Sequence, residues 1–479
     1  MPKTFRPYEP DQRFLLPPSL REWLPEDHLA LFLMDVCQQL DLSRITAYYE
    51  RELRGSPPHH PRMMVTLLVY AYCVGVPSSR KIERRTHEDI AFRVLCANTH
   101  PDHKCISEFR RIHLAALAEL FVQVLRLCQK AGLVKLGHVA LDGTKVKANA
   151  SKHKAMSYDR MKQKEAELEA KVRELLAQAE AADSEEDAAY GKDRRGDELP
   201  EELRRTQDRL ERIRALRAAL EAEARAQAEA DSPSANEDAA VETVLTERNN
   251  IEAAVESKAP RDDDADDPPS PVPTPEPLPA HQIPRNTDGT PTDKAQRNFT
   301  DAQSRIQKTG DGFVQGYNAQ AAVDAAYQII VALGVGSQPP DAEYLVPMLD
   351  RVVDNCGRPP DKASADNGYY SESNVERATS RGIDVYIATG RTKHGRAGAP
   401  RSDADAGTAK ARMKAKLATD EGRAVYARRK AIVEPVFGQI KNRGFRQFLL
   451  RGIEKVRGEW ALIGLSHNLL KLHRAAVAA

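Results

Sequence analysis

Hydrophobic residues recur at helical spacing through the first 135 positions of the chain. The run PRMMVTLLVYAYCVG (61–75) carries a broad apolar surface, and SSRKIERRTHEDIAFRVL (78–95) opens with a serine pair that favours a helix start. The run SEFRRIHLAALAELFVQVLRLCQKAG (107–132) has apolar residues three and four apart and ends at a glycine. This pattern predicts an all-α domain over residues 1–132.

The hydrophobic period changes after residue 132. LVKLGHVALDGTKVKANA (133–150) is short, β-branched and roughly alternating, which indicates a strand or hairpin. Its partners follow only after about 150 residues, as two strands in 312–337 with a turn near Asp324, one strand in 361–371 and one in 384–390. Helices are predicted at 341–357, 372–382, 421–443 and 454–476. Residues 133–155 and 297–479 thus predict an α/β domain, a mixed sheet covered by helices.

Two charged segments interrupt this α/β domain. Residues 156–226 contain two apolar stripes at helical spacing, which predict an antiparallel helical hairpin or short coiled coil with a glycine-containing turn. The stripes are Met161, Leu168, Val172, Leu175 and Ala179, then Leu203, Leu210, Ile213 and Leu220. Residues 227–296 centre on DDDADDPPSPVPTPEPLP and predict a disordered, acidic, proline-rich linker. A spacer or self-association element is the simplest role for the hairpin.

The formal net charge of +1 hides an uneven distribution. Residues 221–295 hold roughly 18 acidic against 6 basic side chains, and residues 391–457 hold roughly 18 basic against 6 acidic ones. Such asymmetry is expected where one end of a chain handles a polyanion, although a solvated surface explains the charges equally well. No apolar run is long enough for a membrane span or a signal peptide, so we expect a cytoplasmic protein with reduced cysteines.

Three acidic residues occupy positions that are typical of active sites. Asp142 lies in the strand ALDGTKVKA, Asp366 ends the strand ASADNGYY, and Glu434 lies in a helix of the basic region. Converging carboxylates repel one another unless a cation joins them, and hard divalent ions prefer oxygen ligands. Two such ions can stabilise both oxygens of an in-line phosphoryl displacement. Each acid taken alone is more often a turn, cap or surface residue.

The helix that carries Glu434 places several polar residues on one face. Tyr426, Lys430, Glu434 and Lys441 are spaced by four, four and seven residues. Pro435 is expected to disturb the helix at this point.

Three passages together resemble bacterial insertion-sequence transposases of the DDE class: ALDGTKVKANAS, ADNGYYSES and YARRKAIVEPVFGQIKNRGFRQF. More narrowly, they resemble the group with a Tyr–Arg–Glu–Lys signature around the third acid. Residues 61–111 are similar to the helical, DNA-binding domain that precedes this catalytic core, and FTDAQSRIQ (299–307) is similar to the connection into its second strand. The resemblance covers about residues 1–155 and 297–475.

The resemblance implies an RNase H-like core in which Asp142, Asp366 and Glu434 hold two Mg²⁺ ions, with Mn²⁺ able to substitute. It implies cleavage at the terminal inverted repeats of an element, then attack of the released 3′-OH on target DNA, by a homodimer or larger assembly associated with the nucleoid. Lys441 fits the signature lysine and Tyr426 the signature tyrosine. Arg429 has the right distance from Tyr426 and Lys430 the right distance from Glu434, so both are candidates for the signature arginine. Further DNA contacts are expected from Lys145, Arg443 and Arg446.

Other functions remain open at this level. A metal-dependent nuclease could use the same three acids, and a catalytically inactive DNA-binding remnant could rely on the helical domain and the hairpin alone. Cys96, His100, His103 and Cys105 form a cluster, but their order does not match usual zinc-ligand spacings. The chain has no glycine-rich loop of the type that binds ATP phosphates.

Overall fold

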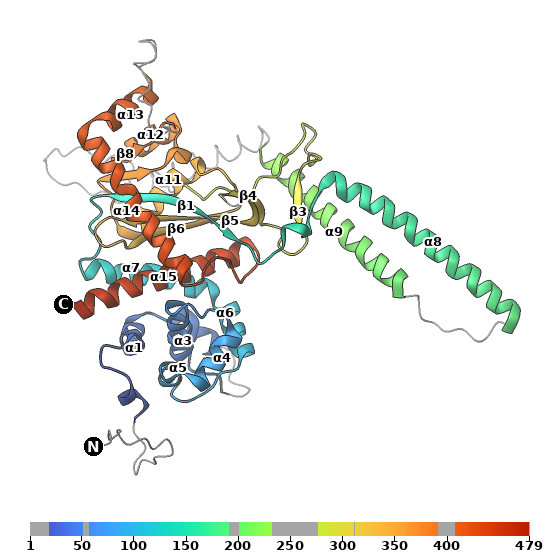
Figure 1. Ribbon diagram of the computed structural model, residues 1–479, viewed down its shortest axis with the longest axis horizontal. Coiled ribbons are helices and arrows are strands. Elements are labelled where there is room, and N and C mark those ends of the chain that lie inside the picture. The colour runs from blue at the N-terminus through green and yellow to red at the C-terminus, as the bar shows by residue number, and fades with distance from the viewer. Residues whose placement is uncertain are drawn as a thin grey trace, which may run out of the picture.

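The computed structural model describes residues 19–50, 57–190, 201–231, 276–310, 312–390 and 408–478, with side chains omitted for 179–190 (Figure 1). The N-terminal region is helical, as predicted. Its elements are η1 (Leu20–Trp23), α1 (Leu29–Gln39), α2 (Ser43–Glu50), α3 (Pro61–Cys73), α4 (Ser79–Glu88), α5 (Ile90–Leu95), α6 (His103–Ile112) and α7 (Leu114–Lys130).

Two helices predicted as continuous are divided in this region. The run 78–95 breaks at Asp89, whose carboxylate accepts the backbone N–H of Ala91 at 2.9 Å and so caps α5. The run 107–132 breaks at His113 between α6 and α7, which bend by 73°. Within the described residues, only this bent pair meets the length and apolarity criteria for crossing a membrane; no single helix does.

A mixed sheet forms the second half of the molecule, with strand order β4-β5-β1-β7-β8 and β6 paired to β5. Its strands are β1 (Val139–Lys147), β4 (Arg305–Thr309), β5 (Gly312–Asp324), β6 (Ile330–Gly336), β7 (Lys362–Ala365) and β8 (Asp384–Ile387). Strand β5 is antiparallel to β1, β4 and β6, whereas β1, β7 and β8 run parallel. Gly316 pairs with both Lys147 and Arg305, and Ala319 with both Thr144 and Val335, so β4 and β6 lie end to end along one side of β5.

Helices cover both faces of this sheet (Figure 1). A Cβ on Gly464 of α15 (Ile453–Ala478) would lie 2.4 Å from the side chain of Leu333, and one on Gly334 would lie 2.8 Å from Met348 of α11 (Leu345–Cys356). Leu333 and Gly334 are consecutive in β6 and point to opposite faces, so α15 and α11 pack on opposite sides. The remaining helices near the sheet are η3 (Ala342–Tyr344), η4 (Asn367–Tyr369), α12 (Glu372–Ser380), α13 (Ala409–Ala418) and α14 (Asp420–Asn442).

The helical region and the sheet share one continuous hydrophobic core. Helix α15 joins them: it packs beside α7 and α3 on one side and β6 on the other. Trp460 of α15 is 1% exposed and donates its indole N–H to the carbonyl of Gln320 at 3.0 Å. The described helices up to α7 therefore do not pack as a separate unit.

Helix α14 continues through Pro435. Proline lacks the N–H that would bind the carbonyl of Ala431 one turn earlier. The side chain of Gln328, from the β5–β6 turn, donates to that carbonyl at 3.0 Å. This hydrogen bond satisfies the carbonyl that Pro435 leaves free, so the helix is not interrupted beside the sheet.

The insertion after β1 contains the predicted helical hairpin, formed by α8 (Tyr158–Tyr190) and α9 (Glu201–Ala230), which projects away from the sheet (Figure 1). Met161, Leu168, Leu210 and Ile213 of the two predicted stripes pack together. Its base is a two-stranded sheet that the sequence pattern did not predict, β2 (Ala155–Ser157) paired with β3 (Gln296–Asn298) and preceded by η2 (Lys152–Lys154). The predicted turn at 191–200 lies outside the described residues.

Both ends of the segment predicted as a disordered linker have a defined structure. Helix α9 extends to Ala230, and residues 276–296 have a defined course. Leu278 is buried in the main core, and Ile283 packs against Leu220 and Ala224 of α9. These apolar side chains offset the ordering cost of an otherwise proline-rich segment. The centre of the predicted linker, 232–275, lies outside the described residues.

Candidate active site

Asp142 projects from the middle of β1 toward helix α14. Asp142 pairs with Ala321 of β5, and Ala321 pairs with Leu333 of β6, whose side chain lies against α15. These three side chains therefore share the face of the sheet that α15 covers. Asp142 Oδ1 accepts the backbone N–H of Gly143 at 2.8 Å, and Oδ2 accepts from Arg429 of α14 at 3.1 Å. Burial raises the pKa of Asp142 to about 6, although Arg429 and the Gly143 N–H oppose this shift and the charge of Asp366 adds to it.

Asp366 follows β7 directly and lies beside Asp142. Val139 pairs with Ala363 and Ala140 with Ser364, so the same parallel register continued along the strands brings Asp142 level with Asp366. Neighbouring strands are about 4.8 Å apart. The Asp366 carboxylate caps η4 by accepting the backbone N–H of Gly368 at 2.8 Å. The two aspartates therefore meet beside the middle of β1, just beyond the carboxyl end of β7. Ligands of α/β sheets bind at such carboxyl strand ends.

Glu434 reaches this pair only through Arg429. The Arg429 side chain is 7% exposed, and its guanidinium lies 3.1 Å from Asp142 and 3.9 Å from Glu434. The Glu434 side chain is 53% exposed, one turn further along α14. Arg429 also lies over the ring of Tyr426 at 5.9 Å from its centroid. Of the two candidates for the signature arginine, Arg429 is the one whose side chain contacts Asp142, whereas Lys430 is exposed.

The carboxylate site, defined here as Asp142, Asp366 and Glu434, has the donor chemistry of a divalent-metal centre. Asp142 and Asp366 lie side by side, and Glu434 lies on the far side of the Arg429 guanidinium. Carboxylate oxygens are the ligands that Mg²⁺ and Mn²⁺ prefer. The guanidinium of Arg429 supplies the positive charge between Asp142 and Glu434. Within the described residues, no three His, Cys, Asp or Glu side chains are close enough together to hold one ion.

A fourth acid, Asp341, supports the site from the other face of β1. Its carboxylate accepts hydrogen bonds from Lys145, Asn318 and Gln320 at 3.2, 2.7 and 3.0 Å. A Cβ placed on Gly368 would lie 3.0 Å from Asp366 and 3.3 Å from Asp341, so both carboxylates border the same turn. Asp341 lies in the loop SQPPDAEY, which has no recognisable motif, and only the long-range register of β1 and β5 brings it here.

The structure places Lys145 on the face opposite to Asp142. The two residues are three positions apart, and side chains alternate along a strand. The Lys145 ammonium is 19% exposed and donates to the carbonyl of Pro339 at 2.9 Å as well as to Asp341. The predicted DNA contact of Lys145 gains no support from this placement, and a role in holding Asp341 explains its contacts.

The remaining predicted DNA contacts lie toward and beyond the end of α14. Lys441 is half-buried two turns after Glu434, and Arg446 is exposed just after the helix. Arg443 is half-buried against α15, where it donates to Ser466 at 3.0 Å. Burial lowers the pKa of Arg443. Arg443 thus fixes the end of α14 to α15, while Lys441 and Arg446 face a more open surface.

Replacing Gly143 with alanine is expected to destabilise the protein by about 1–3 kcal/mol. The added methyl group would lie 2.4 Å from Gln320 Nε2 and 3.0 Å from Asp341 Oδ1, displacing the hydrogen bonds behind the carboxylate site. Gly438→Ala in α14 is the matched control, because nothing lies within 4 Å of the new Cβ. The control should stabilise by up to about 1 kcal/mol. Chemical denaturation of both variants measures this, and equal effects would contradict the crowding at Gly143.

Two family models match the chain, and neither match includes β1. The family described as Transposase domain (DUF772) matches residues 18–111, within the helical region. The family described as Transposase DDE domain matches residues 270–469, which include Asp366, Arg429 and Glu434. Asp142 and the helical hairpin lie between the matched ranges. No curated protein and no solved structure gives a significant match.

Proposed function

We propose that the chain, in which a transposase domain is followed by a transposase DDE domain, is a DDE transposase that cleaves DNA at the ends of an insertion sequence. The released 3′-OH is then joined to target DNA at the same site. In this proposal Asp142, Asp366 and Glu434 are the catalytic acids. The observation that carries it is the meeting of Asp142, in the middle of β1, with Asp366, at the carboxyl end of β7, with Arg429 linking Asp142 to Glu434.

The sheet topology supports an RNase H-like core. Taking β1, β5, β6, β7 and β8 as strands one to five, the spatial order is 3-2-1-4-5, and only the second strand is antiparallel to the others. This arrangement is the one implied by the resemblance to DDE transposases. It places the first and fourth strands side by side, and these strands carry the two aspartates.

Asp142 and Asp366 would hold divalent metal, with Glu434 completing the ligand set. Bound metal supplies charge stabilisation for the attacking and leaving oxygens of the phosphodiester. The Arg429 guanidinium neutralises the charge of Asp142 and orients Glu434. The Tyr426 ring packs against this guanidinium. The exposed Arg428 and Lys430 of α14 flank the site and can attract DNA phosphates. We propose that Arg429, Tyr426, Glu434 and Lys441 together form the Tyr–Arg–Glu–Lys signature.

The test uses the DNA that flanks this gene, which should carry inverted repeats. A marker is placed between these ends, and its excision and reinsertion are scored with the wild-type protein. Excision followed by reinsertion, abolished in vitro by chelation of divalent ions, is the expected result. Excision without reinsertion would support the metal-dependent nuclease instead.

Glu434→Gln tests whether Glu434 is one of the catalytic acids. If Glu434 completes the catalytic acids, the variant binds DNA like the wild type but does not excise the marker. Movement of the marker at the wild-type rate in this variant would remove Glu434 from the proposed site. A remnant would bind DNA and move no marker even as the wild-type protein.

A further inference from the structure

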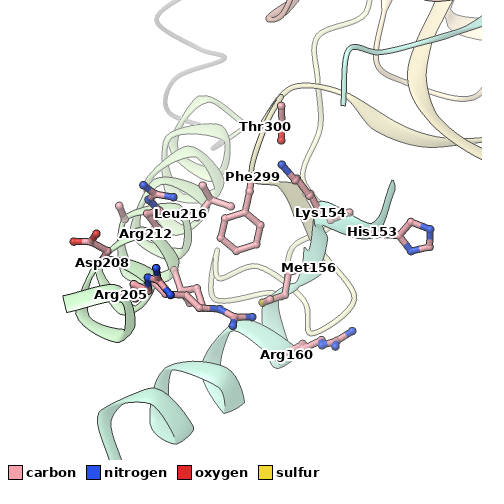
Figure 2. A pocket seen from close by; sticks show the side chains of 14 residues that line it. His153, Lys154, Met156, Arg160, Arg205, Asp208, Arg212, Leu216, Phe299 and Thr300 are labelled. Atoms are coloured by element: carbon pink, nitrogen blue, oxygen red, sulfur yellow. The ribbon is translucent and has the colours of Figure 1, made fainter. Parts of the chain in front are cut away.

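A pocket at the base of the helical hairpin has chemistry that the catalytic proposal does not use. Its volume is about 860 Å³, within the range of ligand-sized sites. Figure 2 shows that its walls come from the start of α8, from α9, and from the chain around β2 and after β3. We call this cavity the hairpin-base pocket.

Positive charge dominates the lining of the hairpin-base pocket. Lys154, Arg160, Arg205, Arg209 and Arg212 line it, whereas Asp208 is its one acidic lining residue. The arginines at 205, 209 and 212 are four and three residues apart, so they lie along a single face of α9. Arg160 and Lys154 approach from the α8 and β2 side (Figure 2).

Four of these cations, Lys154, Arg160, Arg209 and Arg212, differ from Arg214 and Arg217 of α9 in their partners. Arg214 and Arg217 of α9 form ion pairs with Glu165 of α8 at 3.1 and 3.3 Å. In contrast, no ion pair among the described residues includes Lys154, Arg160, Arg209 or Arg212, and all four side chains are exposed. Of the five cations that line the pocket, Arg205 pairs with Glu201, and the other four have no carboxylate partner among the described residues.

The floor of the hairpin-base pocket is apolar. The half-buried ring of Phe299 lies between Leu216 of α9 and Met156 of β2 (Figure 2). Phe299, Met156 and Leu216 pack against the hairpin core, so the segments that carry the basic side chains are held in place around this floor. A cleft with positive walls and a low-dielectric floor concentrates anions more strongly than scattered surface charges do.

We propose that the hairpin-base pocket binds the sugar–phosphate backbone of DNA, as a contact separate from the carboxylate site. This inference rests on the proposed function, since it takes DNA to be the substrate. Unpaired arginines on one helical face match the regular spacing of a phosphodiester chain, and guanidinium groups bind phosphate oxygens in pairs. The contact is independent of sequence because nothing in the pocket reads base edges in a groove.

The test compares two double variants of the full chain on short duplex DNA of mixed sequence. Arg160→Ala/Arg212→Ala removes two pocket cations, and Arg173→Ala/Arg204→Ala removes exposed arginines of the same two helices that do not line the pocket. Fluorescence anisotropy gives Kd over a range of salt concentrations. The slope of log Kd against log salt should fall by about 2 in the pocket variant and remain unchanged in the control.

Asp208→Asn should change DNA affinity in the opposite direction, and misfolding would not tighten binding. Removal of the pocket's acidic side chain should tighten DNA binding about twofold at low salt. Equal slopes for the two double variants, or competition by poly-glutamate as strong as that by DNA, would overturn the pocket proposal. In either case the proposed function stands if the wild type still binds and cleaves DNA. Absence of DNA binding by the wild type would overturn both.

Discussion

If the chain cleaves DNA as proposed, replacing Asp142 with asparagine is expected to lower the rate of cleavage at least about a thousandfold. Asparagine keeps the size of the side chain but removes the charge that a divalent ion requires, and Asp366→Asn should act in the same way. Affinity for DNA should not fall, because neither aspartate attracts phosphate. Single-turnover cleavage of DNA carrying the element ends measures the rate, and a binding assay run in parallel measures affinity.

The Asp142→Asn variant should lose less stability than the wild type as the pH rises from 5 to 8. Burial raises the pKa of Asp142 from 3.8 to about 6, so the folded state prefers the protonated carboxyl. The stability linked to this group is fully present below pH 3.8 and is lost as the pH rises through 6. Asparagine avoids that loss. Its Tm relative to the wild type should therefore rise between pH 5 and pH 8.

Asp361→Asn is the matched control for the cleavage experiment. Asp361 directly precedes β7, at the end opposite to Asp366, and forms an exposed ion pair with Arg358 at 3.2 Å. Its replacement should leave cleavage within about twofold of the wild type, since exposed ion pairs contribute little. Cleavage that survives both Asp142→Asn and Asp366→Asn would show that the active site lies elsewhere.

Arg429→Ala is expected to destabilise the protein by about 3 kcal/mol at pH 8. The substitution removes the cation that lies 3.1 Å from the partly buried Asp142 and leaves that carboxylate without its counter-charge. At pH 5 the loss should be smaller, because Asp142 is then mostly protonated and needs no counter-charge. Chemical denaturation at the two pH values measures both effects.

Lys430→Ala tests whether the effect belongs to position 429 alone. Lys430 is the adjacent exposed residue of α14, and its replacement should change stability by no more than about 0.5 kcal/mol at either pH. A double-mutant cycle of Arg429→Ala with Asp142→Asn should show a coupling of about 1 kcal/mol or more. Additive losses in that cycle would mean that Arg429 acts through packing rather than through its charge.

The sequence pattern predicted the parts of the site that depend on local periodicity. Alternating residues identified the strand of Asp142, a glycine turn marked the end of the strand of Asp366, and helical spacing identified the helix of Glu434. Motif spacing did not decide whether Arg429 or Lys430 faces the sheet. That choice depends on the rotation of α14 about its axis, which the burial of Val433 and Val436 against the sheet determines.

The contacts that sequence reasoning missed are long-range. Asp341 becomes part of the site only because β5 pairs with β1 over nine residues and brings Asn318 and Gln320 beneath Asp142. The side of β1 on which Lys145 lies could have been predicted from alternation, since an odd offset from Asp142 reverses the face. The β2–β3 sheet joins segments about 140 residues apart, beyond the reach of any local pattern.

The position of the hairpin insertion has a consequence for the timing of synthesis. Strand β1 leaves the ribosome about 165 residues before β5, the antiparallel partner on which its place in the sheet depends. At roughly 5–20 residues per second, the strand carrying Asp142 waits on the order of ten seconds for that partner, and Glu434 follows later still. An incomplete nascent chain therefore holds no assembled set of acids. The three proposed catalytic acids can come together only after the helix that carries Glu434 has been synthesised.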